Sequence, residues 1–364
     1  MTGAAVLSSV TYIPVLAKYT LGADEFLISI IVAFYATAAF FASYYFGRAG
    51  DIYGRRLILR AGIFLAVATF GLLIVTTSIE MLFIVRTLNG FCVGIYPGAL
   101  AAYAYESDMK MGRFASFGAL GWGFGTLFAG FAASIEIHLA FAVSTVFFVL
   151  AFASALTLPP IERTQIRVPL IPIATLKRNA AVYVAILIRH SSANALWTLW
   201  SPFLISLGAD TVQVGIVQAA NSIAQVVFMI ALVDNFDYKK LVQVGLVTTS
   251  VTFGYFTIVS LYSDWVQMMP AQILLGFSWS CLYVGALKFV TERNEERSTA
   301  SGLLTAMLSI AGVIGPLIAA VVRIFTTSYI PILLNAIVMS LIALIIFGYH
   351  TRNDRGTIDI TSQS

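Results

Sequence analysis

Charged side chains are scarce in this chain of 364 residues, because Asp, Glu, Lys and Arg together make up only 10% of it. Cysteine occurs twice and histidine three times, with no spacing typical of a metal site and no support for a disulfide. The chain has no Gly-Lys-Ser/Thr phosphate-binding loop and no Ser, His and Asp arrangement of a hydrolase. The sequence therefore predicts a protein that is not an enzyme, with no metal and no cofactor.

Hydrophobic residues, by contrast, make up 59% of the chain, and the mean hydropathy is +0.91. Both values lie far from those of soluble domains and predict an all-α integral membrane protein. The apolar runs are continuous rather than alternating, which favours helices over a β-barrel. At about 20 residues per span, we expect twelve transmembrane helices near residues 2–19, 25–46, 57–77, 80–105, 113–134, 139–158, 179–206, 211–233, 241–262, 265–290, 298–322 and 328–349. The first run lacks a basic leader and a cleavage site, so we interpret it as a retained helix.

The Lys and Arg residues predict the orientation of these helices. Most of them fall on one side of the membrane if the N-terminus is cytoplasmic, whereas only Lys18 and Arg323 fall at the outer face. We therefore expect a multi-pass protein of the plasma membrane with both termini in the cytoplasm. The net charge of +4 reflects this topology, and no basic cluster with interleaved aromatics predicts nucleic-acid binding.

The chain also repeats itself. The residues Leu-Gly-Ala-Asp at 21–24 recur at 207–210, and Gly90-Phe91 recurs as Gly276-Phe277 at the same offset. This repeat predicts two pseudo-symmetric bundles of six helices, over residues 1–158 and 179–350. The proline-containing, basic segment 159–178 is then a cytoplasmic linker, and residues 351–364 are a cytoplasmic tail.

Two motifs resemble those of the major facilitator superfamily. Residues 47–56, Gly-Arg-Ala-Gly-Asp-Ile-Tyr-Gly-Arg-Arg, resemble the charged loop of this family between its second and third helices, although Ala49 and Ile52 depart from its usual residues. Residues 86–90, Arg-Thr-Leu-Asn-Gly, resemble its Arg-x-x-Gln-Gly element, with Asn89 in place of glutamine. The resemblance covers essentially the whole chain and implies two six-helix bundles that rock against each other around a central site.

The resemblance also implies a gate. In the family, the loop aspartate braces the two bundles near the start of the eleventh helix, where a helix N-terminus favours negative charge. We expect Asp51 to reach that helix near Ser298, and the loop residues Gly47, Gly54, Arg55 and Arg56 to complete the gate. The alternative is that these charges only fix the topology.

A second group of candidates lies inside the predicted spans. Arg189 and His190 fall close to the middle of the bilayer, and Arg86 lies roughly two turns inside the fourth span. Buried guanidinium groups without buried acids predict an anionic substrate, bound by Arg86 from one bundle and Arg189 from the other. For Arg86, a role in helix packing or proton handling is the alternative.

Polar and aromatic side chains form stripes on the helices around these charges. The resemblance implies that helices one, four, seven and ten surround the cavity, and the stripes lie mostly on such helices. Ordinary packing between helices is the alternative for each of these residues. The further candidates for substrate binding are Asn194, Trp197, Gln218, Asn221, Gln225, Gln272, Trp279 and Tyr283.

These observations predict a secondary active or facilitative transporter that moves a small organic anion by rocker-switch alternating access. Proton-coupled efflux of drugs or other amphiphilic compounds is the second interpretation, and a non-transporting membrane sensor is the third. The fifth span lacks the Gly-Pro signature of the drug exporters of the family, which favours the first interpretation. If transport is proton-coupled, His190 is the candidate residue, because histidine is the side-chain type that ordinarily changes charge near neutrality, while neighbouring Arg189 should disfavour its protonated form. A co-transported or exchanged ion stays open, and we expect a monomer.

Overall fold

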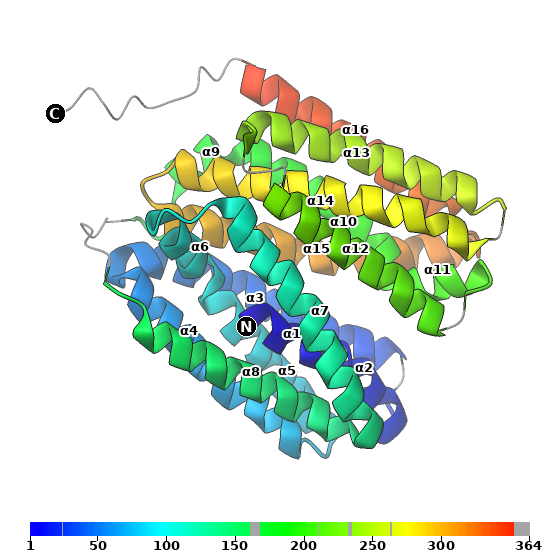
Figure 1. Cartoon of the computed structure of the whole chain (residues 1–364), viewed down its shortest axis with the longest axis horizontal. Helices are drawn as coiled ribbons and strands as arrows, with labels where there is room; N and C mark the ends of the chain where they lie inside the picture. The colour runs from blue at the N-terminus through cyan, green and yellow to red at the C-terminus, as the bar shows by residue number, and fades with distance from the viewer. Residues whose placement is uncertain (24, 161–167, 210, 232–234, 263, 353–364) are drawn as a thin grey trace.

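The computed structural model is helical in almost every residue that it describes (Figure 1). It describes the whole chain except residues 24, 161–167, 210, 232–234, 263 and 353–364. The helices form two groups that lie side by side, one holding α1 to α8 and the other α10 to α16.

The elements of the first group follow the first half of the chain. They are α1 (Thr2–Val10), α2 (Ile13–Val15), the π-helix η1 (Leu16–Thr20), α3 (Glu25–Tyr53), α4 (Arg55–Gly71), the 3₁₀ turn η2 (Leu72–Val75), α5 (Ile79–Ile95), α6 (Pro97–Glu106), α7 (Met111–Ile135) and α8 (Ile137–Thr157).

A short helix, α9 (Ile173–Arg178), leads into the second group. That group contains α10 (Ala180–Thr198), α11 (Trp200–Ser206), α12 (Thr211–Ala231), α13 (Tyr238–Val259), the 3₁₀ turn η4 (Trp265–Gln267), α14 (Met268–Glu292), α15 (Arg297–Phe325) and α16 (Ile330–Arg352).

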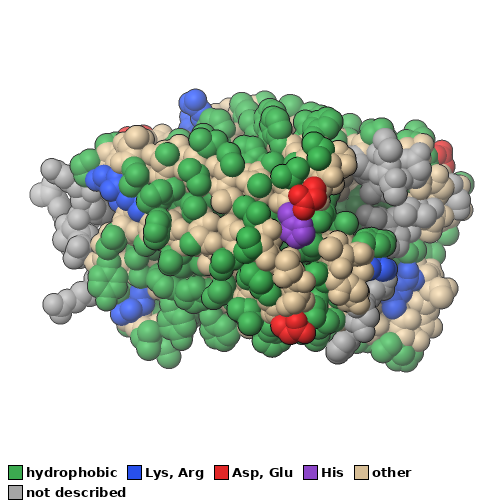
Figure 2. All heavy atoms as spheres, turned by 90° about the horizontal axis from the view of Figure 1, so that it is seen from below, with side chains coloured by type: hydrophobic (Ala, Val, Ile, Leu, Met, Phe, Trp, Pro, Cys, Tyr) green, Lys and Arg blue, Asp and Glu red, His purple; other side chains and the backbone are tan. Residues whose placement is uncertain are grey.

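Nine helical spans in the described part of the chain are long and apolar enough to cross a bilayer, counting α5 with α6 as one span. The other three predicted spans correspond to α1 through η1, α10 with α11, and α12, whose apolar part Ile216–Ala231 is shorter. Hydrophobic side chains make up most of the face in Figure 2, and charged ones are few. The predicted all-α membrane architecture therefore matches the helices that are described.

Two predicted spans of the first group are interrupted where a proline follows. The span expected at 2–19 ends as α1 at Val10, and α2 starts again beside Pro14. The span expected at 80–105 divides into α5 and α6 at Tyr96, immediately before Pro97. Proline lacks the amide hydrogen that the helix needs and restricts the residue before it, so each break has a local cause.

The charged segment at 47–56, which the sequence predicts to be a tight turn between two spans, is helical except at one residue. The helix expected at 25–46 continues as α3 to Tyr53, and α4 begins at Arg55. Only Gly54 lies between them, with a φ of 101°, which is a conformation that favours glycine. The turn is therefore a single residue, and its charged neighbours project from helices.

The backbone repeats in the two halves. Gly22 and Gly208, at equivalent places in the repeated Leu-Gly-Ala-Asp sequence, both have positive φ values, of 71° and 88°. One hydrophobic cluster has buried residues only between Ala5 and Ala155, and another only between Ala193 and Ala336. Of the predicted linker and tail, residues 161–167 and 353–364 lie outside the described residues, while α9 occupies the end of the linker.

The two groups of helices come closest where α15 meets α3 and α6. An added Cβ atom at Gly47 would lie 2.9 Å from the Cα atom of Gly302, and one at Gly98 would lie 2.7 Å from the Ser298 carbonyl oxygen. Small residues let helix backbones approach this closely. The contact leaves no space for larger side chains at this end of the molecule.

Candidate functional site

Asp51 joins the two groups of helices at one end of the molecule. This end also holds Glu106 and Arg297, and we call it the basic end. The Asp51 carboxylate accepts hydrogen bonds from the backbone amides of Ser298, at 3.2 Å, and Thr299, at 2.7 Å. The Thr299 hydroxyl donates to it as well, at 2.6 Å. These groups form the first turn of α15, whose free amides and helix dipole stabilise a negative charge. Because Asp51 is only 5% exposed, water competes little for these bonds.

An ionic network extends from this contact. Arg55, the first residue of α4, donates to Asp51 at 2.9 Å and forms an ion pair with Glu106 of α6. Arg297, the first residue of α15, contacts Glu106 at 3.4 Å, and its guanidinium lies 4.7 Å from the centre of the Tyr105 ring. Charged groups of α3, α4, α6 and α15 are thus linked at the basic end.

The segment before α10 spans the same end of the molecule. Arg48 of α3 donates to the carbonyl oxygens of Val168, at 2.7 Å, and Pro169, at 3.0 Å. On the other side, Arg178 of α9 donates to Asn294, at 3.0 Å, and to Glu296, at 3.1 Å. This segment therefore holds the end of α3 and the start of α15 from opposite sides.

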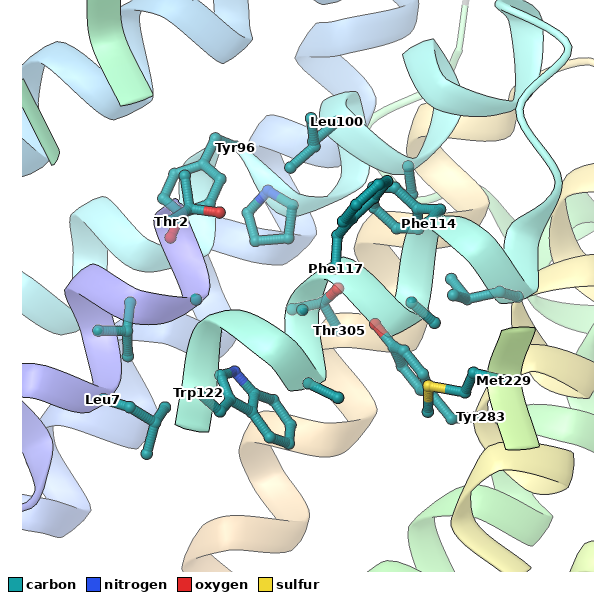
Figure 3. A pocket seen from close by; sticks show the side chains of 18 of the residues that line it. Thr2, Leu7, Tyr96, Leu100, Phe114, Phe117, Trp122, Met229, Tyr283 and Thr305 are labelled. Carbon is teal, nitrogen blue, oxygen red and sulfur yellow. The ribbon is translucent and has the colours of Figure 1, made fainter. Parts of the chain in front are cut away.

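A cavity of about 410 Å³ lies between the two groups of helices, with walls from α1, α5, α6, α7, α12, α14 and α15 (Figure 3). We call it the aromatic cavity, because Tyr96, Phe114, Phe117 and Trp122 line it from the first group and Trp279 and Tyr283 from the second. Among its described lining residues, none has a charged side chain. Its volume lies in the range of sites for drug-sized molecules.

Polar groups on this wall are few. Gln225 of α12 and Ser301 and Thr305 of α15 line the aromatic cavity. The hydroxyl groups of Tyr283 and Thr305 point toward the same region in Figure 3, beside Phe117. The wall is thus mostly apolar, with a small number of hydrogen-bonding groups that can orient a ligand.

Arg189 and His190 lie behind the cavity wall rather than on it. The Arg189 guanidinium lies 5.4 Å from the centre of the Trp279 ring, and its Nε donates to the Thr249 hydroxyl at 3.2 Å. The His190 ring stacks on Trp279 with 5.1 Å between ring centres, and Trp279 in turn stacks on Tyr283 at 5.3 Å. One indole therefore separates the buried cation from the space in the cavity.

Arg86 is buried elsewhere, between α5 and α3. Its guanidinium lies 4.1 Å from the centre of the Tyr35 ring, and its Nε and Nη1 atoms have no hydrogen-bond partner among the described residues. Asn89, one turn further along α5, is fully buried and is likewise without a partner for its amide. Neither residue lines the aromatic cavity.

The predicted substrate-binding residues thus do not form one continuous site. Gln225, Trp279 and Tyr283 line the aromatic cavity, and Asn221 supports Gln225 from α12. Gln218 is exposed, and Gln272 is fully buried. Asn194 packs against Gly315, and Trp197 packs edge to face on Trp200 with ring centres 4.9 Å apart.

The predicted gate residues lie closer together than the predicted substrate-binding residues do. Asp51, Arg55 and Gly54 form the junction between α3 and α4, and Gly47 packs against Gly302. Arg56 is half-buried, and its Nε atom has no hydrogen-bond partner among the described residues.

Several residues of the cavity could not be singled out by a search for charged and polar side chains. Phe114, Phe117 and Trp122 look like lipid-facing residues of an apolar helix, and only the glycines between and beyond them in α7 indicate close approach. Tyr96 and Pro97 line the cavity at the break between α5 and α6. That break itself was detectable, because proline interrupts a helix.

The helices, their apolar surfaces and the central cavity define a multi-pass membrane protein of the transporter class. The family model of the Major Facilitator Superfamily matches residues 1–232 and 182–362, and the chain belongs to this family of transporters, which are not enzymes. The fold class and the family resemblance expected from the sequence are confirmed.

Two known proteins illustrate the relationship. The tetracycline resistance protein, class B, of Escherichia coli is 23% identical to the chain over 320 residues, which cover 80% of this chain and 78% of that protein. The crystal structure of the human organic anion transporter MFSD10 (TETRAN) matches with a TM-score of 0.75 and 14% identity, over 92% of this chain and 88% of that one. The second likeness shows the shared fold.

Proposed function

We propose that this transporter carries an amphiphilic organic solute with an aromatic body through the membrane by rocker-switch alternating access. The observation that carries the proposal is the aromatic cavity, which has rings from both groups of helices and no charged side chain on its described wall. Flat apolar solutes gain burial and stacking against such rings, and each aromatic pair adds about 0.5–1.5 kcal/mol beyond area burial. The relative that confers tetracycline resistance is consistent with such a passenger.

The contacts at the basic end support a gate in the same cycle. Asp51 accepts hydrogen bonds from the Ser298 and Thr299 amides in the first turn of α15, and the Gly47 and Gly302 backbones touch beside it. In this proposal the structure represents a state closed at the basic end, which faces the cytoplasm, and both contacts separate when the cavity opens to that side. We place the protein in the plasma membrane with both termini in the cytoplasm, and the distribution of Lys and Arg supports this orientation.

An organic anion is the second candidate, and a specific observation favours it. Arg86 and Arg189 are each 2% exposed, and no ion pair with an acidic group is found for either within the described residues. The field of Arg189 reaches the cavity through Trp279, so an acidic group on an aromatic solute is favoured near that ring.

A ligand-stabilisation screen tests both candidates. The midpoint of thermal unfolding of the purified protein is measured with three sets of compounds of similar size: neutral aromatic amphiphiles, aromatic carboxylates and hydrophobic cations. Stabilisation by the first set that is lost in Trp279→Leu and Tyr283→Leu supports the main proposal. Trp265→Leu is the matched control, because Trp265 does not line the cavity.

The anion alternative predicts a different outcome in the same screen. Aromatic carboxylates alone stabilise the protein, and Arg189→Gln removes that effect. Stabilisation by no set, or by hydrophobic cations alone, contradicts both candidates.

A further inference from the structure

The hydroxyl group of Tyr283 is an unused hydrogen-bond donor on the wall of the aromatic cavity. Tyr283 of α14 is partly exposed, and its hydroxyl group points into the space beside Phe117 (Figure 3). The group forms no hydrogen bond with any residue that the structure describes, and its oxygen is accessible rather than enclosed by protein atoms. A tyrosine hydroxyl that is buried in a protein usually finds a partner there. This one faces the cavity with its hydrogen free for a solute.

The ring that carries this hydroxyl group is held by its neighbours. Tyr283 lies one turn after Trp279 on α14, and the two rings stack with 5.3 Å between centres and 11° between planes. The His190 ring stacks on Trp279 in turn, at 5.1 Å. A swing of the Tyr283 side chain would break this stack. The hydroxyl oxygen therefore has a fixed place, while its hydrogen can still turn about the C–O bond toward an acceptor.

Thr305 of α15 presents the opposite hydrogen-bonding character in the same region. Its hydroxyl group donates to the Ser301 carbonyl oxygen, one turn earlier on α15, at 3.1 Å. A hydroxyl group has a single hydrogen, so Thr305 can offer a solute only the lone pairs of its oxygen. Of the two hydroxyl groups that point toward this region in Figure 3, Tyr283 is therefore the one that can donate to an oxygen of a solute.

We propose that Tyr283 is a specificity-determining residue whose hydroxyl group donates to a carbonyl oxygen of an aromatic solute in the cavity. This inference rests on the proposed function and adds a polarity to it: the passenger is an aromatic amphiphile that carries an acceptor oxygen. The rings of Trp279 and Phe117 suit the aromatic body, and the O–H group of Tyr283 fixes the place of the oxygen. A donor on a stacked ring binds its partner with little ordering cost.

Matched pairs of compounds test the inference. Isothermal titration calorimetry on the purified protein compares 4-acetylbiphenyl with 4-isopropenylbiphenyl, and 2-acetylnaphthalene with 2-isopropenylnaphthalene. Within each pair a C=O group is replaced by a C=CH₂ group of nearly the same shape. The quantity compared is the ratio of the two dissociation constants of a pair, because the difference in hydrophobicity between its members is the same for every variant.

Tyr283→Phe removes the donor and keeps the stacked ring. One neutral hydrogen bond changes an affinity by about three- to tenfold. We therefore expect Tyr283→Phe to weaken the binding of the ketones by about three- to tenfold relative to the alkenes, and to leave the affinity for the alkenes nearly unchanged.

Two further variants keep the outcome interpretable. Tyr283→Leu also removes the hydroxyl group and replaces Tyr283→Phe if the latter does not fold, because the ratio within each pair then shows the same loss. Tyr255→Phe, on α13 and away from the cavity wall, removes a hydroxyl group of the same kind and keeps the ratio of the natural sequence.

The inference and the proposed function fail in different ways. If the ratio in Tyr283→Phe equals that of the natural sequence, or shifts in favour of the ketones, the donor role is wrong while the aromatic passenger stands. If Tyr283→Phe weakens ketones and alkenes alike, Tyr283 acts only in packing and the inference is also wrong. If none of the four compounds binds to the natural sequence, the inference and the aromatic passenger fail together.

Discussion

Replacing Asp51 by asparagine tests the proposed gate with the smallest change of shape. The carboxylate receives a backbone amide and a side-chain hydroxyl from Thr299 on one oxygen, and the Ser298 amide and Arg55 on the other. An asparagine keeps one acceptor and turns an NH₂ group toward the donors of the lost oxygen. We therefore expect Asp51→Asn to weaken the closed state selectively.

The magnitude follows from these bonds. Hydrogen bonds to charged groups contribute about 1.5–3 kcal/mol, and neutral ones about 0.5–1.5 kcal/mol. Losing the charge and two of the donors weakens the contact of Asp51 with α15 by about 3 kcal/mol, which shifts the ratio of closed to open molecules by roughly 100-fold.

Thiol labelling measures this shift. Cys92 and Cys281 are both buried and free, so they are replaced by alanine, and a single cysteine is introduced at Ser301, which is 1% exposed. An impermeant maleimide is then added to the medium around inside-out vesicles, whose outer surface carries the basic end of the protein. We expect Asp51→Asn to raise the labelling rate at least about tenfold, since labelling requires the open state.

Asp237 supplies a matched control. It occupies the repeat-related position and accepts from the amides of Lys239, at 2.9 Å, and Lys240, at 3.1 Å, but these belong to its own helix, α13. Asp237→Asn should leave the labelling rate unchanged. Equal rates in folded Asp51→Asn and in the natural sequence would refute the gate.

Three other predictions follow from contacts described above. Gly302→Ala should raise the same labelling rate, because a Cβ atom there would lie 2.6 Å from the Gly47 Cα atom, whereas Gly312→Ala should not, since nothing lies within 4 Å of its Cβ position. Asn294→Ala should lower the midpoint of thermal unfolding by several degrees without faster labelling, because Asn294 and Asn179 exchange two buried hydrogen bonds of 3.0 Å within one half, worth about 1–3 kcal/mol; a faster labelling rate would contradict this local role. If transport is proton-coupled through His190, uptake by vesicles that contain His190→Ala should lose its dependence on a pH gradient, and a retained dependence would exclude that residue.

The sequence predicted the helices well because their signal is compositional. Continuous apolar runs specify spans whatever the packing, and prolines at 14 and 97 mark the two interruptions described here. The contact of Asp51 with the start of α15 was expected through the resemblance to the family, because the residues alone do not say which helix N-terminus an aspartate reaches.

The wall of the cavity was less predictable. Whether Phe117 or Trp122 faces lipid or a solute depends on how two helix bundles pack, and an apolar side chain suits both surroundings. Arg189 shows the limit of charge as a signal: its charge indicated a binding site, and its side chain lies behind Trp279 rather than on the cavity wall. Charge identifies a residue that needs a partner, whereas the direction of its side chain depends on the tertiary structure.

The single glycine between α3 and α4 has a mechanical consequence. With one residue at φ 101° between them, and with Arg55 at the start of α4 bonded to Asp51 near the end of α3, the two helices cannot rotate independently. Any tilt of α3 that separates it from α15 must carry α4 along. A change at one carboxylate therefore acts on the adjoining ends of both helices.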